Sequence, residues 1–297
     1  MSAITILDGG MGQELVRRYG ELNKAMWGIG VMAENPEIVR AVHDDYFAAG
    51  AEIATTNTYN IHRDRFVRDG VEDQFDVLNK LACCLAAEAR DEHGAGQVAG
   101  GIGPLGGSYR PDHGNDLDQA ATAFEEIALG QKDYVDFYII ETIASLDAAR
   151  GAMAGASVPG KPVWLSFTVD DDDGAIIRSG ETVADAVKLS EELGAAAMLI
   201  NCSRPEAVSD AVSRLSSASM PVGAYANGFT RITEAFKSDA PKITDLSERK
   251  DLGPDAYADF GDAWVASGAT IIGGCCEVGP AHIAELSRRL AQKNGGA

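Results

Sequence analysis

The chain has 297 residues, of which 45% are hydrophobic and 24% charged, an ordinary composition for a globular protein with a large core. Its 25 basic and 45 acidic residues give a net charge of -20, which disfavours nucleic-acid and membrane partners because it repels phosphate groups. We find no apolar run of about eighteen residues and no secretory signal, and the five cysteines suggest no disulfide framework. We therefore expect a cytoplasmic protein with reduced thiols.

Eight apolar runs of strand length alternate with amphipathic, helix-like stretches. The runs are residues 4–7, 52–56, 98–102, 135–140, 163–167, 197–200, 221–225 and 270–273. Near-continuous apolar runs are typical of parallel strands that helices cover. The predicted helices are 11–18, 35–50, 71–93, 116–133, 145–156, 182–193, 206–217, 260–266 and 280–290.

This alternation predicts a (β/α)8 TIM barrel that occupies residues 1–297 as a single domain. A doubly wound open sheet is the competing α/β fold. The turn after the first run reads Asp8-Gly9-Gly10-Met11-Gly12, which lacks the G-x-G-x-x-G spacing of that fold. Residues 229–254 form the longest stretch without an evident strand. We interpret them as an extended loop over the barrel mouth, and the sequence leaves open whether it is a mobile lid.

Three cysteines follow predicted strands. Cys202 ends the sixth run, and Cys275 and Cys276 end the eighth, whereas Cys83 and Cys84 lie within a predicted helix and are interpreted as packing residues. Barrel enzymes carry their chemistry at these strand ends. Three thiolates with one open position are typical of catalytic zinc, so we predict one zinc ion on Cys202, Cys275 and Cys276. A strained Cys275–Cys276 disulfide is the lesser alternative.

The ligand set indicates the chemistry. Three thiolates make zinc a poor Lewis acid for hydrolysis, but zinc lowers the pKa of a further bound thiol and keeps it nucleophilic. The site therefore favours alkyl transfer to sulfur.

The sequence resembles the homocysteine S-methyltransferase family over nearly its whole length. The resemblance rests on Leu7-Asp8-Gly9-Gly10-Met11-Gly12-Gln13-Glu14-Leu15, Glu34-Asn35-Pro36, His43-x-x-Tyr46-x-x-Ala49-Gly50-Ala51, Thr55-Thr56-Asn57-Thr58-Tyr59, Glu141-Thr142, Asn201-Cys202 and Gly273-Gly274-Cys275-Cys276. The family fold is a (β/α)8 barrel. The resemblance implies a zinc-dependent transfer of a methyl group to homocysteine, which gives methionine.

The resemblance also assigns residues to substrate binding. Asp8 and Glu141 match carboxylates that grip the homocysteine ammonium group, with Gly9 beside Asp8, and the homocysteine sulfur takes the fourth zinc position. A helix N-cap is the alternative role for Asp8, and a structural ion pair is the alternative for Glu141. Asn57 and Asn201 either hydrogen-bond the substrate or orient its neighbours. No catalytic residue is assigned beyond the zinc site.

The methyl donor is not identified by the sequence. Thr142 stands where some betaine-dependent members have a tyrosine, and the long C-terminal extension of those enzymes is absent, which favours S-methylmethionine or a similar sulfonium donor. Trp27, Tyr59 and Tyr225 are aromatic candidates for facing such a cation. A methyltransferase that needs a separate corrinoid protein and a non-catalytic zinc- or thiol-binding protein are the alternatives. We expect a monomer or weak homo-oligomer.

One acidic run near the predicted mouth remains to be placed. Residues 170–173, which follow the fifth run, are interpreted as a solvated loop, and Arg178 is close enough in sequence to approach the mouth.

Overall fold

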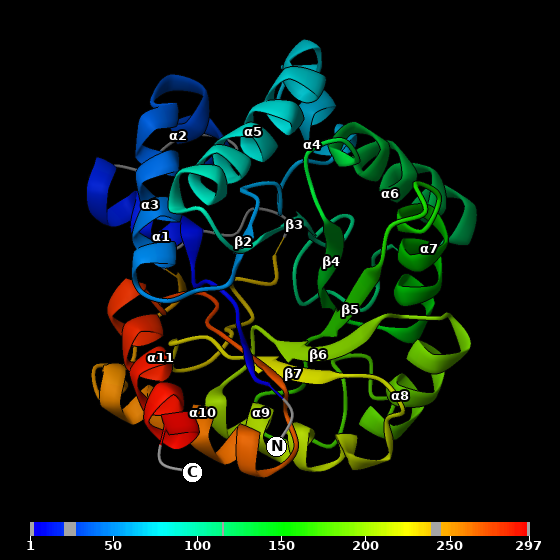
Figure 1. Cartoon of the computed structure of the whole chain (residues 1–297). Helices are drawn as coiled ribbons and strands as arrows, with labels where there is room; N and C mark the ends of the chain where they lie inside the picture. Colours follow the sequence, from blue (N-terminus) through cyan, green and yellow to red (C-terminus); the bar gives the residue numbers. More distant parts are fainter. Residues whose placement is uncertain (1–2, 21–27, 115, 239–244, 296–297) are drawn as a thin grey trace.

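A computed structural model of the chain describes residues 3–20, 28–114, 116–238 and 245–295. Eight parallel strands pair in the order β1-β8-β7-β6-β5-β4-β3-β2. A parallel bridge between Leu7 and Ile53 joins the two ends of that order, so the sheet closes into a barrel. Helices surround the strands in a ring (Figure 1), which confirms the predicted (β/α)8 barrel.

All eight predicted strands are present. They are β1 (Thr5–Ile6), β2 (Ile53–Thr55), β3 (Gln97–Ile102), β4 (Phe137–Ile143), β5 (Val163–Phe167), β6 (Ala197–Asn201), β7 (Val222–Tyr225) and β8 (Ile271–Ile272). The helices are α1 (Met11–Tyr19), α2 (Gly28–Glu34), α3 (Pro36–Ala48), α4 (Arg63–Arg68), α5 (Phe75–His93), α6 (Leu117–Gln131), α7 (Leu146–Ala156), α8 (Val183–Glu192), α9 (Pro205–Ser213), α10 (Pro254–Ala266) and α11 (Pro280–Gly295), with 3-10 turns η1 (Glu72–Gln74) and η2 (Leu215–Ser217).

The strands are apolar on both faces because each face is buried. Ile139 and Leu199 point into the barrel, where they pack in a cluster with Leu7 and Ile271. Their chain neighbours on β4 and β6 pack outward in the larger core between sheet and helices. This two-sided burial explains why the strands read as continuous apolar runs rather than alternating ones.

Local signals set several helix boundaries. The side chains of Asp116, Ser145 and Thr182 accept hydrogen bonds at the starts of α6, α7 and α8, and Thr182 forms a capping box with Asp185. Two short helices, α2 and α4, were not predicted, and α10 begins at Pro254 rather than at 260. No helix in the described ranges is long and apolar enough to span a membrane.

The strand β4 differs from its prediction in a way that affects the site. It continues to Ile143, past Glu141 and Thr142, whereas the apolar run suggested an end at 140. The pairing of β4 with β5 changes register between Ile140 and Ile143. This irregularity redirects the strand, as β-bulges do near active sites.

Candidate active site

Three sulfur atoms meet at one end of the barrel. Cys202 follows β6, and Cys275 and Cys276 follow β8, so the ligands come from two strands that flank β7. Their sulfur atoms all lie within 4.8 Å of one another. Tetrahedral zinc, with Zn–S bonds of about 2.3 Å, places its sulfur ligands about 3.8 Å apart. The three cysteines could therefore hold a metal ion, while Cys83 and Cys84 lie on α5, away from this cluster.

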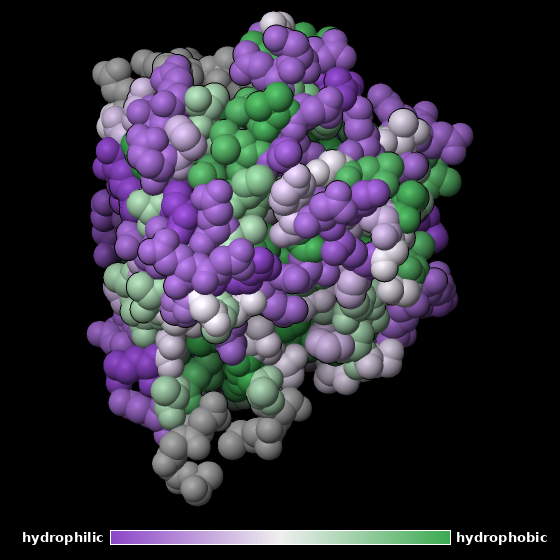
Figure 2. Space-filling view, turned by 45° about the horizontal axis from the view of Figure 1, so that its top comes forward, coloured by the Kyte–Doolittle hydropathy of each residue, from purple (hydrophilic) through white to green (hydrophobic). Residues whose placement is uncertain are grey.

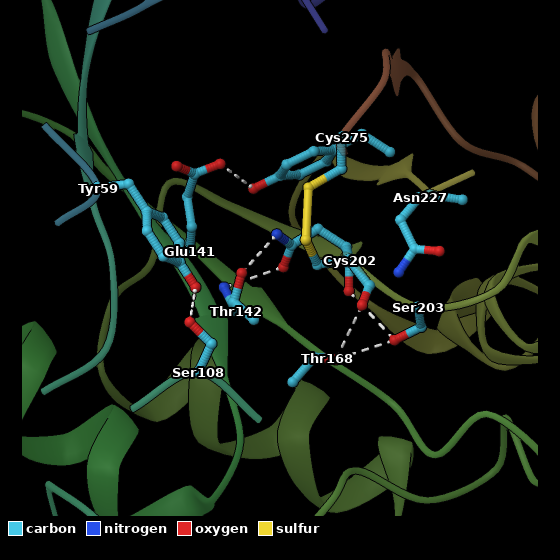
Figure 3. Close-up of a disulfide and its surroundings, with 12 residues drawn as sticks. Tyr59, Ser108, Glu141, Thr142, Thr168, Cys202, Ser203, Asn227 and Cys275 are labelled. Carbon is cyan, nitrogen blue, oxygen red and sulfur yellow. Dashed lines mark hydrogen bonds between the residues drawn. A yellow bond between two sulfur atoms is a disulfide. The ribbon is translucent and has the colours of Figure 1, made fainter. Parts of the chain in front are cut away.

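Cys202 and Cys275 form a disulfide bond in this structure, with their Cα atoms 5.8 Å apart (Figure 3). The expectation of reduced thiols is therefore wrong for this pair, and the bond does not join the adjacent Cys275 and Cys276. The physical reason is that the ends of β6 and β8 bring Cys202 and Cys275 to the same point. The same two sulfur atoms can either bond to each other or ligate a metal as thiolates, so the two states exclude each other.

Unusual backbone conformations gather around the sulfur cluster. Among the described residues, the non-glycine residues with positive φ are Tyr109 (64°), Thr142 (60°), Cys202 (51°) and Glu277 (64°). Cys202 carries a sulfur atom of the cluster, Tyr109 packs against Cys202, and Glu277 follows Cys276. Such conformations persist only where the surroundings enforce them, and they cluster at functional sites.

Asn201 holds two of these strained positions together. Its Oδ1 accepts hydrogen bonds from Thr142 N at 3.0 Å and from Ser166 Oγ at 2.7 Å, and its Nδ2 donates to Thr142 Oγ1 at 2.9 Å. Asn201 is fully buried, and its amide is engaged by β4 and β5. Of the two expected roles, these contacts favour orientation of neighbours over contact with a substrate.

The same cavity holds two carboxyl groups. Asp8 and Glu141 line it together with Cys202, Cys275 and Cys276. Asp8 accepts hydrogen bonds from Thr55 N at 2.6 Å and Thr55 Oγ1 at 2.9 Å. It does not cap α1, whose N-cap is Gly10.

Glu141 projects toward the same space (Figure 3) and accepts a hydrogen bond from the Tyr225 hydroxyl at 3.1 Å. Within the described residues, no lysine, arginine or histidine forms an ion pair with Asp8 or Glu141. The described residues therefore do not support a structural ion pair as the role of Glu141.

Burial dominates the electrostatics of the cavity. It raises the pKa of Asp8 to about 8, against the lowering effect of the Thr55 hydrogen bonds, and a further small rise comes from Glu141. Burial also raises the pKa of Glu141 to about 7, against the Tyr225 hydrogen bond. A buried carboxylate without a cation is costly, so this pair is suited to a positively charged ligand.

The N-terminus of α1 forms another wall of the cavity. Gly9 and Gly10 both line it, and a Cβ atom at Gly9 would overlap the Val278 carbonyl and the Tyr46 ring. A Cβ atom at Gly10 would lie 2.6 Å from the Cys275 carbonyl oxygen. Glycine is therefore required where α1 approaches the β8 loop. Asn57 also lines the cavity, and its Nδ2 donates to the Gly28 carbonyl at 3.1 Å.

The apolar wall of the cavity was missed by the sequence analysis. Tyr109, Phe229 and Ile232 pack with Cys202, and Phe236, Leu246, Cys275 and Cys276 join this cluster at its edge. We call it the aromatic wall. Its aromatic and aliphatic members lie in the connections after β3 and β7, where the sequence shows no strand or helix pattern. The sequence signal that could have indicated Tyr109 was a single tyrosine in the Gly-rich stretch 103–114.

The aromatic residues expected to face a cation have other contacts. The Tyr59 hydroxyl is hydrogen-bonded to Ser108 Oγ at 2.7 Å, and Tyr225 donates to Glu141. Both still line the cavity. Trp27 lies outside the described residues.

Gln13, on the first turn of α1, is a second residue that was missed. Its side chain is 3% exposed, and its Nε2 has no partner of hydrogen-bonding geometry within the described residues. Gln13 lines the cavity beside Cys276. Burial raises the pKa of the Cys276 thiol to about 12, and the interaction with Gln13 lowers that pKa. An unpaired buried N–H donor facing a cysteine fits a metal thiolate, which accepts such hydrogen bonds.

The raised pKa of Asp8 predicts that Asp8→Asn stabilises the fold relative to the wild type, and that this stabilisation grows with pH. A carboxyl group whose pKa is about 8 when folded and 3.8 when unfolded stabilises the fold below about pH 4 and loses that contribution as the pH rises to 8. Relative to the wild type, Asp8→Asn should gain at least about 1 kcal/mol of unfolding free energy between pH 5 and pH 8. Urea unfolding of ligand-free protein measures this. A difference that does not change with pH would contradict it.

The disulfide makes thiol content a direct measure of the state of the site. The denatured protein should show 5 reactive thiols in a reduced sample and 3, those of Cys83, Cys84 and Cys276, in a sample whose Cys202–Cys275 pair is oxidised. Metal analysis should then find tight zinc binding only in the reduced sample, because the oxidised pair offers no thiolates. Equal zinc binding in both samples would place the metal elsewhere.

Comparison with known proteins agrees with this geometry. The homocysteine S-methyltransferase family model matches residues 5–290. The homocysteine S-methyltransferase YbgG of Bacillus subtilis is 29% identical over 306 residues, which cover 96% of this chain and 93% of the relative.

The homocysteine methyltransferase MmuM of Escherichia coli has been solved in metallated and oxidised forms. Each form is 28% identical to this chain and has a TM-score of 0.81. The alignments cover 97% of this chain for the metallated form and 96% for the oxidised form, with 96% of MmuM in both. This chain belongs to the homocysteine S-methyltransferase family.

Proposed function

We propose that this protein transfers a methyl group from a small onium donor, with S-methylmethionine or a similar sulfonium favoured, to the thiol of homocysteine. The observation that carries the proposal is one cavity lined by three cysteine sulfur atoms and by the carboxyl groups of Asp8 and Glu141, which have no cationic partner among the described residues. An amino thiol complements both features at once. The barrel formed by residues 1–297 would bind homocysteine as a single domain, with one zinc ion on Cys202, Cys275 and Cys276.

The walls of the cavity suggest how homocysteine lies. Its ammonium group would sit between Asp8 and Glu141, since only a cation offsets the cost of ionising both groups. Its carboxylate would face the backbone N–H groups in the first turn of α1, at Met11 to Gln13, which line the cavity. Asn57 would line the cavity next to this carboxylate. Asn201 would hold Thr142 and the adjacent Glu141 in place.

Zinc, when bound, would hold the homocysteine sulfur as a nucleophilic thiolate near neutral pH. The chain's own residues supply position and a dry environment. The aromatic wall covers the cysteines on their apolar side, which keeps water from the methyl group. In the transfer, a new S–CH3 bond forms on homocysteine, and the donor's C–S bond breaks with its electron pair, leaving a neutral thioether.

A panel of donors tests this function. Zinc-loaded protein with homocysteine should form methionine from at least one small sulfonium or quaternary ammonium donor without added protein. Formation only with a corrinoid protein would favour the two-component alternative. Tight homocysteine binding without methionine formation from any donor would favour a non-catalytic protein.

The variant Cys276→Ala should lose zinc and reduce methionine formation at least about a hundredfold, since removing a thiolate breaks the site. Cys84→Ala is the matched control, because Cys84 lies on α5 and is only partly buried. It should keep about one zinc per chain and wild-type activity. Full activity in Cys276→Ala would refute the zinc site.

The carboxyl pair predicts a pH dependence of amine binding. At pH 6 both Asp8 and Glu141 are largely protonated in the free protein, because their pKa values are about 8 and about 7. An ammonium ligand requires the carboxylates, so methionine should bind to the zinc-loaded protein more tightly at pH 8 than at pH 6. Methionine is the probe because it has no thiol to titrate. Calorimetry on the wild type should show this rise, and Glu141→Gln should reduce it to the part that comes from Asp8. An equal rise in that variant would separate Glu141 from the amine.

A further inference from the structure

Arg178 is a buried arginine that contacts two residues of its own β5–α8 connection and one residue, Tyr109, of the connection between β3 and α6. Its side chain is 4% exposed and lies in the connection between β5 and α8. Its Nη2 pairs with Asp171 Oδ1 at 3.0 Å, and its Nε donates to Thr168 Oγ1 at 3.1 Å. Its guanidinium group lies 5.1 Å from the centre of the Tyr109 ring. Asp171 is itself buried, so the interpretation of residues 170–173 as a solvated loop is wrong at that position.

The contact with Thr168 reaches the sulfur cluster. Thr168 Oγ1 lies 2.9 Å from Ser203 Oγ and donates to the Cys202 carbonyl at 3.4 Å (Figure 3). Ser203 Oγ also accepts from Val169 N at 3.0 Å. These bonds hold the chain at the carbonyl of the strained Cys202 and at Ser203, which directly follows it.

The contact with Asp171 reaches the long connection between β7 and α10. Asp171 Oδ2 accepts a hydrogen bond from Ile232 N at 2.7 Å. Ile232 packs with Phe229 in the aromatic wall. The position of this part of the wall is therefore fixed through Asp171 to Arg178.

The contact with Tyr109 reaches the remaining part of the wall. The Tyr109 backbone has a φ of 64°, and its ring packs at 6.0 Å, centre to centre, against Phe236. A guanidinium group over an aromatic face is attracted by the negative charge of the ring face, more strongly when both groups are buried. Lysine cannot reproduce this planar, forked set of contacts.

We propose that Arg178 is the positioning residue that assembles the methyl-donor side of the site, through Tyr109 and the Phe229–Ile232 part of the aromatic wall. The inference rests on the proposed function. The amine-binding carboxyl groups lie on β4 and directly after β1, whereas Arg178 contacts the wall that covers the sulfur atoms. We place the donor against this wall, because Tyr109, Phe229 and Phe236 line the cavity beside the cysteines and aromatic faces attract an onium cation. A disturbed wall should therefore weaken donor use and leave homocysteine binding intact.

The decisive measurement is the effect of Arg178→Met on the two substrates separately. We expect the donor KM to rise at least about tenfold and the homocysteine KM to change less than about threefold, with zinc still at one per chain. Arg249→Met is the matched control, since Arg249 lies on the connection between β7 and α10 and pairs with Glu206 at 2.6 Å and Asp251 at 2.7 Å. It should leave both KM values unchanged. An equal rise in the two KM values, or loss of zinc, would overturn the proposal.

Two further variants keep the test informative if Arg178→Met does not fold because Asp171 is left unpaired. Arg178→Lys keeps a cation for Asp171 and should show a smaller rise in donor KM. Tyr109→Leu leaves the ion pair intact and should raise the donor KM as Arg178→Met does, whereas Tyr109→Phe, which keeps the ring, should not. A wild-type donor KM in both Arg178→Lys and Tyr109→Leu would overturn the proposal.

A double-mutant cycle separates positioning from an independent effect. If Arg178 acts through Tyr109, Arg178→Lys combined with Tyr109→Leu should raise the donor KM little more than Tyr109→Leu alone. Multiplicative effects would show that the two residues act separately, against the proposal. Failure of the proposed function is distinguishable, because the wild-type protein would then form no methionine in the same assay.

Discussion

Closure of the barrel is the constraint on which the site depends. The bridge between Leu7 and Ile53 joins the ends of the strand order and places β1 beside both β2 and β8. Asp8, which directly follows β1, thereby lies between the β8 cysteines and Thr55 of β2, which donates hydrogen bonds to its carboxylate. An open sheet with the same strand order would keep Asp8 beside Cys275, because β1 pairs with β8, but would leave Thr55 at the opposite edge. The closed parallel barrel instead brings all eight carboxyl ends of the strands to one rim.

The carboxyl pair imposes a cost that no cation in the described part of the chain offsets. Asp8 is buried, Glu141 is half-buried and raises the pKa of Asp8, and both have only hydroxyl and backbone partners among the described residues. A group tuned by burial and left without an opposite charge indicates a ligand-binding role. The surface carries its charge differently, in exposed ion pairs such as Arg214 with Asp210, and the face in Figure 2 is mostly hydrophilic with smaller apolar patches.

The sequence predicted those parts of the molecule that leave a one-dimensional pattern. The barrel and the strand ends at Cys202 and Cys275 followed from apolar runs that stop at a thiol. The position of Glu141 within β4 did not, because the irregular pairing after Ile140 lets polar residues continue the strand. The burial of Asp171 was hidden in a run of four aspartates, since only its partner Arg178, on the returning chain, distinguishes it. Contacts between loops leave no periodic pattern in the sequence.

Selection of the acceptor, under the proposed function, follows from how rigidly the two halves of the site are joined. The Asn201 amide binds Thr142 on β4, adjacent to Glu141, and its own backbone leads directly into Cys202. The separation between the amine-binding carboxyl group and the sulfur cluster is thus set by a buried side chain bonded to neighbouring strands. A rigid span favours one chain length between amine and thiol, so under the proposed function cysteine, which is one methylene shorter, would bind less tightly than homocysteine. A single methylene changes binding by about 1–3 kcal/mol in a simple pocket, and a fixed two-point span adds the cost of leaving one end unpaired.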